Sequence, residues 1–335
     1  MTLLPGSKFT HFAYNPNVAA NACYIAILSF CLLAQLVQGL RYRTWNFMGP
    51  MLAGISLELM GYTARIFMHN NPSSREAFLV DNITLILGPA FLLASIYLCM
   101  GHLVRIYGEN LSYLKPRTYL LIFVACDLVN LTLQGLGGGV SSTQQHQKGI
   151  QAGINIVIAG LASQVASLFI FMLCCTYFTI KIHRHPEEVL VEYRSIRETR
   201  LFRAFLFGIG VATTCIFTRS VFRIIELRQG FTGPLANSEI HFMILEGGMV
   251  LIAVAVLTTL HPGYCFQGYW RIPEVTKIYD TRNQKTHNLK SSLLRKGMSY
   301  SEEDFREVVD EFVAGKFDGV GTVITSRVLL EDVVT

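Results

Sequence analysis

Charged side chains are scarce in this sequence. Asp, Glu, Lys and Arg make up 15% of its 335 residues, whereas 51% are hydrophobic. A balance this far towards apolar residues is typical of a chain embedded in lipid. The net charge is only +5, and the basic excess falls in the loops between apolar stretches. The composition therefore gives no indication that a nucleic acid is a partner.

Nucleotide-binding and metal-binding motifs are also missing. The glycine-rich run Gly135–Gly139 lacks the following Lys-Ser/Thr of a phosphate-binding loop, so ATP is not expected to be the direct energy source. The nine histidines are scattered, with His241 and His261 at opposite ends of one apolar stretch. No metal site is therefore predicted, and a zinc-dependent intramembrane amidase is disfavoured. We expect no cofactor and no enzymatic activity.

Long apolar stretches are what the sequence does contain. Each has about the ~20 residues that a helix needs to cross ~30 Å of hydrocarbon, where the backbone must satisfy its own hydrogen bonds. The sequence thus predicts an all-α, polytopic membrane protein with seven transmembrane helices. The stretches are Val18–Gln38, Phe47–Met68, Val80–Leu103, Thr118–Gly138, Gly153–Ile180, Phe202–Leu227 and Ile240–His261.

The basic residues of the loops predict the orientation. The positive-inside rule places the basic loops in the cytosol, which puts the N-terminus outside and the C-terminus in the cytosol. No cysteine falls in a predicted outer loop, so an extracellular disulfide framework is not expected. The first, third and fifth loops carry Arg41, Arg43, Arg105, Lys115, Arg117, Lys181, Arg184, Arg194, Arg197, Arg200 and Arg203, against Lys8, Arg75, Lys148 and Arg228 elsewhere.

This topology predicts three parts. Residues 1–17 form a short extracellular N-terminus without an evident cleavable signal, and residues 18–262 form the seven-helix domain. Residues 263–335 form a cytosolic tail that is partly disordered. Its basic first part, Arg271–Lys296, is suited to lie against anionic membrane lipids.

Polar side chains inside the apolar stretches are the candidate site residues. Ionisable groups there cost several kcal/mol, roughly, unless they pair or face water, and here they follow helical faces. On the predicted topology most of them fall in the outer half or near the midplane. We therefore predict that they converge on a substrate cavity between the helices. The predicted substrate-binding residues are Glu58, Arg65, Asp127, Gln134, Gln164, Arg219, Arg223, Glu226 and Glu246.

Two further polar residues, Asp81 and Asn82, stand at the start of the third stretch, and Asn82 begins a glycosylation sequon. Any of the polar residues could instead be structural, because Arg–Glu pairs and amides also hold helices together. Glu58 and Glu246 are the strongest functional candidates. A carboxylate near the midplane or in a cavity can bind an amine or carry a proton.

An ordered set of short motifs is found within the segment from about Tyr14 to Gly263. It comprises Gln38–Trp45, Glu58 with Gly61, Tyr62 and Arg65, Gly88–Leu92, Ala94–Cys99, Cys126-Asp127, Leu133-Gln134, Gly137–Gly139, Ala159–Leu161, Gln164-Val165, Arg219–Glu226 and His261–Gly263. Together these motifs resemble the fungal lipid-translocating exporter family, which includes sphingoid long-chain-base exporters and aminocholesterol-resistance proteins. Two positions depart from it: His102 stands where Arg is commoner, and Glu246 where Asp is expected.

The resemblance implies a transporter of amphipathic lipids. It points to sphingoid long-chain bases, or related toxic amphiphiles, moved towards the outer leaflet of the plasma membrane, with internal membranes as an alternative location. The ammonium group would pair with Glu58 or Glu246, and the hydroxyls would meet Gln134 and Gln164. Facilitated movement and proton coupling both remain open.

The alternative is a seven-helix sensor of a lipid or of stress that signals through the fifth loop and the tail. The number of spans does not separate it from a transporter. Against it, the third stretch does not end in Asp-Arg-Tyr, and the seventh contains neither Asn-Pro-x-x-Tyr nor a Lys for retinal. The sequence leaves the oligomeric state open.

Overall fold

The structure is a computed structural model that describes residues 17–71, 74–143, 146–186, 189, 193–228, 239–266 and 270. These residues belong to one unit that extends to Trp270. Within them every regular element is a helix. The predictions for residues 1–16 and for the tail from residue 271 onward lie outside the described residues.

Long helices coincide with all seven predicted stretches and run past most of their ends. Three short helices, η1 (Glu109–Leu111), α6 (Arg194–Arg197) and α10 (Pro262–Cys265), lie between or after them. The long ones are α1 (Val18–Tyr42), α2 (Trp45–Asn70), α3 (Arg75–Tyr107), α4 (Pro116–Thr143), α5 (Gln147–Arg184), α7 (Arg200–Arg228) and a last segment made of α8 (Glu239–His241), the π-helical η4 (Phe242–Gly248) and α9 (Met249–Thr259).

Six of the long helices are long and apolar enough to cross a membrane. The exception is α2, which is 26 residues long but mixes Gly, Pro and charged side chains with its apolar residues. Its charged side chains Glu58 and Arg65 face the protein, and both are 1% exposed. The polar character of α2 is thus directed inward, where other helices cover it.

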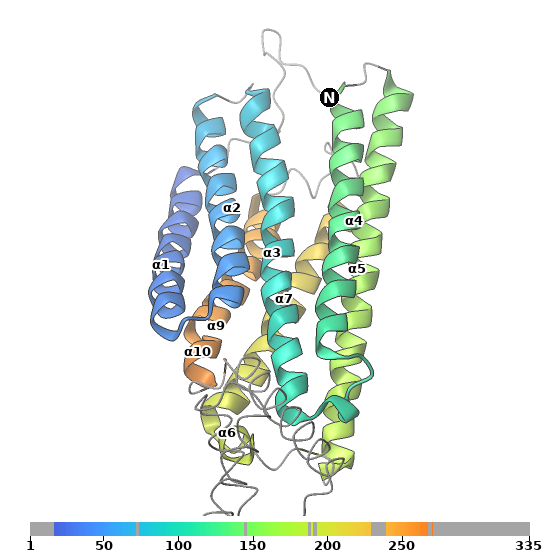
Figure 1. Ribbon diagram of the computed structural model, residues 1–335. Helices are drawn as coiled ribbons and strands as arrows, with labels where there is room; N and C mark the ends of the chain where they lie inside the picture. Colours follow the sequence, from blue (N-terminus) through green and yellow to red (C-terminus); the bar gives the residue numbers. More distant parts are fainter. Residues whose placement is uncertain are drawn as a thin grey trace, which may run out of the picture. The chain divides into compact units, whose positions relative to one another are not determined.

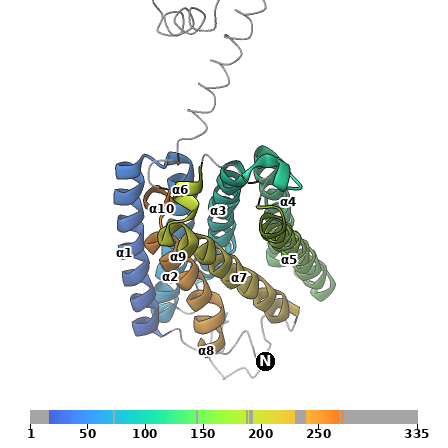
Figure 2. The same cartoon turned by 90° about the horizontal axis from the view of Figure 1, so that it is seen from below.

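The helices form a closed bundle. α1, α2 and α3 pack in sequence, α4 and α5 form an antiparallel pair, and α7 lies between α3, α5 and α9 (Figures 1 and 2). Contact between α9 and α1 completes the ring. Because successive helices run in opposite directions, α1, α3 and α5 all finish at one end. We call it the basic end, since it carries Arg41, Arg105, Lys181 and Arg194.

Glycines allow α4 and α5 to approach closely. A Cβ atom on Gly153 of α5 would lie 2.5 Å from the backbone nitrogen of Ser141 on α4, and one on Gly137 would lie 2.7 Å from the carbonyl oxygen of Gly153. The run Gly135–Gly139 does not unwind, because α4 stays helical to Thr143. Small residues at such contacts are typical of helices packed in lipid.

Trp270 packs against the basic end of the bundle. Its ring centroid lies 4.0 Å from that of His102 on α3, 5.3 Å from Phe266 and 6.1 Å from Phe47 on α2. The chain reaches this position through α10, whose first turn is capped by His261. Residues that follow the last long helix are therefore part of the folded unit.

Candidate functional site

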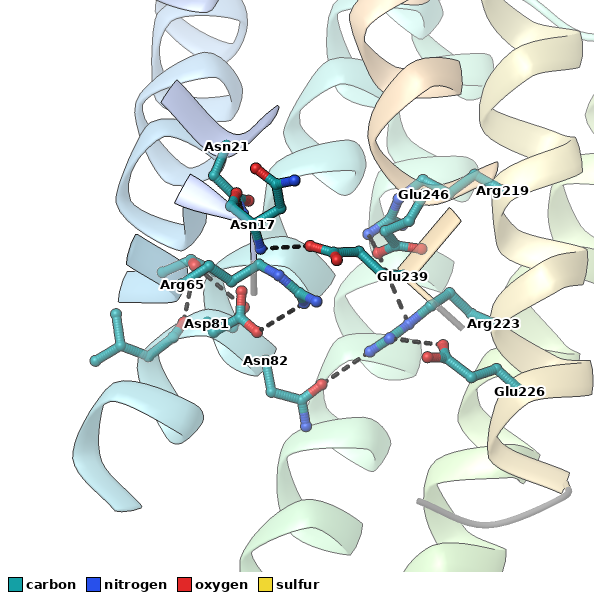
Figure 3. A network of polar contacts seen from close by, with 12 residues as sticks. Asn17, Asn21, Arg65, Asp81, Asn82, Arg219, Arg223, Glu226, Glu239 and Glu246 are labelled. Atoms are coloured by element: carbon teal, nitrogen blue, oxygen red, sulfur yellow. Dashed lines mark hydrogen bonds and ion pairs between the residues drawn. The ribbon is translucent and has the colours of Figure 1, made fainter. Parts of the chain in front are cut away.

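Seven ionisable side chains form a buried charge cluster between α2, α3, α7 and η4, and Figure 3 labels all of them except Glu58. None of them is more than 9% exposed. Six were predicted as site residues from the sequence, and Asp81 is the seventh. The cluster consists of Glu58, Arg65, Asp81, Arg219, Arg223, Glu226 and Glu246.

Ion pairs connect different helices in this cluster. Arg65 of α2 lies 3.4 Å from Asp81 of α3, and Arg219 of α7 lies 2.5 Å from Glu246 of η4. Removing one partner of a buried pair typically costs about 3–5 kcal/mol, because the other charge is left uncompensated. These pairs therefore fix how α2, α3, α7 and the last segment pack together.

Arg223 contacts polar residues on three elements of the site. It pairs with Glu226 at 2.8 Å on its own helix and lies 3.8 Å from Glu246. Its Nη2 atom also donates a hydrogen bond of 2.8 Å to Oδ1 of Asn82 on α3. The predicted sequon residue Asn82 is therefore an internal partner of the cluster.

A proline explains how Arg219 is anchored to α3. Pro89 has no backbone N–H, so it cannot bond the carbonyl of Leu85 four residues earlier. Arg219 donates to this freed carbonyl oxygen and, with the same Nη2 atom, to Glu246. Asp81, Leu85 and Gly88 follow one face of α3 with spacings of four and three residues. That stripe, together with Pro89, is the sequence signal that could have placed α3 in the site.

Glu58 differs from the other carboxylates of the cluster. It is 1% exposed, and neither of its carboxyl oxygens has a hydrogen-bond partner among the described residues. It packs on Gly88, where a Cβ atom would lie 2.7 Å from Oε1. Arg219 is its strongest electrostatic neighbour of opposite sign, but Arg219 is already bound to Glu246. The cluster thus holds four carboxylates and three guanidinium groups, and Glu58 is the unpaired one.

The wide turn at η4 positions Glu246. π-Helical turns contain an extra residue, and they occur frequently at functional sites. The carbonyl of Met243 in this stretch accepts a 2.7 Å hydrogen bond from Tyr24 on α1. Arg65 stacks on Phe242 of the same stretch, with its guanidinium carbon 3.6 Å from the ring centroid. Hydrophobic periodicity could not predict this irregular turn.

The other three predicted site residues form a separate group on α4 and α5. Asp127 accepts a 3.0 Å hydrogen bond from the Tyr97 hydroxyl of α3. Gln134 of α4 donates to Gln164 of α5 at 3.0 Å, and its own Oε1 atom is buried without a partner. The structure therefore places the nine predicted residues in two groups.

An apolar cavity of about 680 Å³ lies beside both groups, and we call it the first cavity. Its volume is within the ~300–1,000 Å³ typical of small-molecule sites. Asn82, which binds Arg223, and Gln134, which binds Gln164, both lie in its wall. Most of the remaining wall is apolar: Phe78, Leu79, Ile83, Ile86, Leu87, Leu131, Ile150, Ile154, Val157 and Leu227.

A second cavity of about 740 Å³ lies between α3, α5 and α7, nearer the basic end. Val157 and Leu161 of α5 pack on Leu227 of α7 towards the first cavity.

Within the parts of the chain that the structure describes, no three His, Cys, Asp or Glu side chains are grouped so as to hold a metal ion.

Apolar helices of crossing length, packed around buried charges, define a multi-pass membrane protein. The chain belongs to the family described as "RTA1 like protein", whose model matches residues 51–269. This confirms the relationship to fungal lipid-translocating proteins that the motifs indicate.

Three relatives from Saccharomyces cerevisiae (strain ATCC 204508 / S288c) are similar along most of the chain. "Sphingoid long-chain base transporter RSB1" is 29% identical, with 88% of this chain and 89% of the relative covered. "Protein RTA1" is 27% identical, with coverages of 66% and 68%. "Protoporphyrin uptake protein 1" is 26% identical, with coverages of 61% and 65%. No solved structure matches the chain.

Proposed function

We propose that this protein transports amphipathic lipids across a membrane, with sphingoid long-chain bases as its preferred substrates. The observation that carries the proposal is the first cavity, an apolar chamber whose wall includes Asn82 and Gln134 from the two buried polar groups. The name of the relative RSB1, which aligns with 88% of this chain, supports the same substrate class. Relatives named for transport and uptake favour this function over sensing or enzymatic activity.

The chemistry of a sphingoid base matches this arrangement. Its alkyl chain would occupy the apolar part of the first cavity, and its hydroxyls would meet Asn82 and the unpaired Oε1 of Gln134. Its ammonium group needs a carboxylate. Glu58 lies outside the cavity wall, but it is the carboxylate of the cluster without an ion-pair partner, so we assign the counter-charge to it. The predicted substrate residues thus contribute in two ways: Gln134 by contact, and the charge cluster by holding the helices and supplying the counter-charge.

The topology that we propose has seven membrane spans, with α2 included. The basic end faces the cytosol, so that the N-terminus, residues 1–17, lies outside, and the tail, residues 263–335, lies inside. The gathering of Arg41, Arg105, Lys181 and Arg194 at one end of the bundle supports this orientation. The first cavity then lies in the outer half, as release towards the outer leaflet requires, and the plasma membrane is the proposed location.

Filling the first cavity tests this function. Gly138 lines it, and a Cβ atom there would meet nothing within 4 Å, so Gly138→Leu adds bulk without striking the backbone. We expect release of a labelled sphingoid base from fungal cells to fall at least about tenfold, which corresponds to ~1.4 kcal/mol. Gly49→Leu on α2 is the matched control, since Gly49 also has open space around it and lies outside the cavity.

Both variants are compared with the unsubstituted protein at equal surface abundance. Normal release by Gly138→Leu would show that the first cavity is not on the transport path. Absence of release by the unsubstituted protein itself would overturn the choice of substrate.

A further inference from the structure

The second cavity is bounded by three helices near the basic end. Met100, Leu103 and Tyr107 of α3, Phe178 and Ile182 of α5, and Leu206 and Phe207 of α7 contribute to its wall. Threonine hydroxyls also lie there, but those of Thr176, Thr179 and Thr214 donate to carbonyls of their own helices. The wall is therefore apolar in effect, and it suits a hydrocarbon chain.

One cation, Arg197, lies outside the cavity wall but packs on a residue of that wall. The guanidinium carbon of Arg197 on α6 lies 5.4 Å from the ring centroid of Tyr107, which is itself a wall residue. The Nη1 atom of Arg197 is buried and has no hydrogen-bond partner among the described residues. The nearby carboxylate, Glu198, is bound to Arg194 at 2.7 Å instead.

Arg197 forms no ion pair with the described residues. Its pKa is lowered from the ordinary value because burial removes water from the guanidinium cation. Arg cannot be deprotonated in a protein, so this group keeps its positive charge. Its planar, partly desolvated donors are suited to a phosphate, which they can bind in a bidentate manner.

The positive charge of Arg197 determines which lipid head group can bind beside it. A sphingoid base would bring an ammonium group towards Arg197 and would be repelled, whereas an anionic head group would be attracted. Further cations in the same region are Lys181, whose Nζ atom donates 2.8 Å to the carbonyl of Asn110, and Arg203 at the start of α7. Basic pockets between membrane helices are suited to bind anionic lipid head groups.

We propose that the second cavity is a binding site for an anionic glycerophospholipid of the surrounding leaflet, with one acyl chain between α3, α5 and α7 and its phosphate on Arg197. The site is distinct from the proposed substrate site in the first cavity. The bound lipid would link α6 to the three helices of the wall. Its occupancy does not depend on which substrate is transported.

The test uses the purified full-length chain in nanodiscs that contain either phosphatidylserine with phosphatidylcholine or phosphatidylcholine alone. Lipid that remains bound after release from the disc is identified by native mass spectrometry. We expect retained phosphatidylserine to exceed phosphatidylcholine, and Arg197→Gln to lower phosphatidylserine retention about tenfold. Arg197→Lys keeps the charge and should lose less.

A second variant tests binding of the acyl chain separately from binding of the head group. Gly210 lines the cavity and has open space at its Cβ position, so Gly210→Leu should reduce retention of both lipids. Arg200→Gln removes the same charge from an exposed position outside the cavity wall, and should leave retention unchanged. Adding inorganic phosphate tests whether the head group alone is recognised, and it should displace little lipid.

Equal phosphatidylserine retention by the unsubstituted protein and Arg197→Gln would overturn the head-group assignment. Unchanged lipid retention in Gly210→Leu would overturn the proposal that an acyl chain occupies the second cavity. Loss of retention in Arg200→Gln as large as in Arg197→Gln would show a diffuse surface charge effect instead of a site. Each of these results is independent of sphingoid-base release.

Discussion

At the scale of single residues, the two strongest functional candidates, Glu58 and Glu246, differ in whether their carboxylates are paired. Glu246 binds Arg219 at 2.5 Å, whereas Glu58 is buried to the same extent without a partner. Burial of an isolated carboxylate is unfavourable, and burial of a paired one is compensated. The same chemical substitution should therefore have different consequences at the two positions.

Glu58→Gln and Glu246→Gln test this contrast. We expect Glu246→Gln to lower the free energy of unfolding by about 3–5 kcal/mol, because Arg219 loses its counter-charge. Glu58→Gln should leave stability unchanged or raise it, while lowering release of a sphingoid base. Thermal unfolding in detergent and the release assay measure the two effects. A loss of stability in Glu58→Gln equal to that in Glu246→Gln would show that Glu58 is only a structural charge.

At the scale of elements, α3 is the helix on which the site depends. It meets Arg65 through Asp81, Arg223 through Asn82 and Arg219 through the carbonyl of Leu85. It also contributes to the walls of both cavities. A change in the path of α3 would therefore alter the charge cluster and both cavities together.

Pro89→Ala tests this dependence. The new backbone N–H can bond the carbonyl of Leu85, so Arg219 would have to share its acceptor. We expect release to fall about tenfold at equal abundance. Pro116→Ala is the matched control, because Pro116 is the first residue of α4, where an N–H has no partner within the helix. Similar release by Pro89→Ala and the control would contradict the role of the freed carbonyl.

The sequence predicted the helices far better than the contacts between them. Uninterrupted apolar residues at α1 or α5 can only be helical in lipid, and the structure confirms helices at these places. The charges on α2 and α7 also indicated the buried cluster. Its internal pairing was not predictable, because it depends on the π-helical turn at Glu246 and on the carbonyl freed by Pro89, and both act across helices.

The separation of Asp127, Gln134 and Gln164 from the charge cluster has a related cause. A helical stripe shows which residues share a face, but it does not show which neighbour that face meets. The stripe on α4 faces α3 and α5, where Tyr97 and Gln164 bind it. Asp81 and Asn82 were not predicted as substrate-binding residues because they lie near the end of an apolar stretch, where polar residues are common.

At the scale of the whole molecule, the direction of the bundle in the membrane decides which leaflet each cavity faces. We expect a cysteine-reactive, membrane-impermeant reagent to label a single cysteine placed in residues 1–16 of intact cells. A cysteine placed after residue 300 should be labelled only after permeabilisation. The eight native cysteines are replaced by serine or alanine first. Labelling of the tail in intact cells would invert the proposed orientation, and with it the leaflets that we assign to the two cavities.

The position of Trp270 makes the molecule its own fluorescent probe. The chain has two tryptophans; Trp45 at the start of α2 is 56% exposed, and Trp270 is 6% exposed against His102 and Phe266. A Trp45→Phe protein would therefore emit from Trp270 alone. A red shift of that emission, with greater quenching by acrylamide, would report that the chain after α9 has left the basic end. Attachment of this segment could then be followed in real time, without a label, while lipid is added.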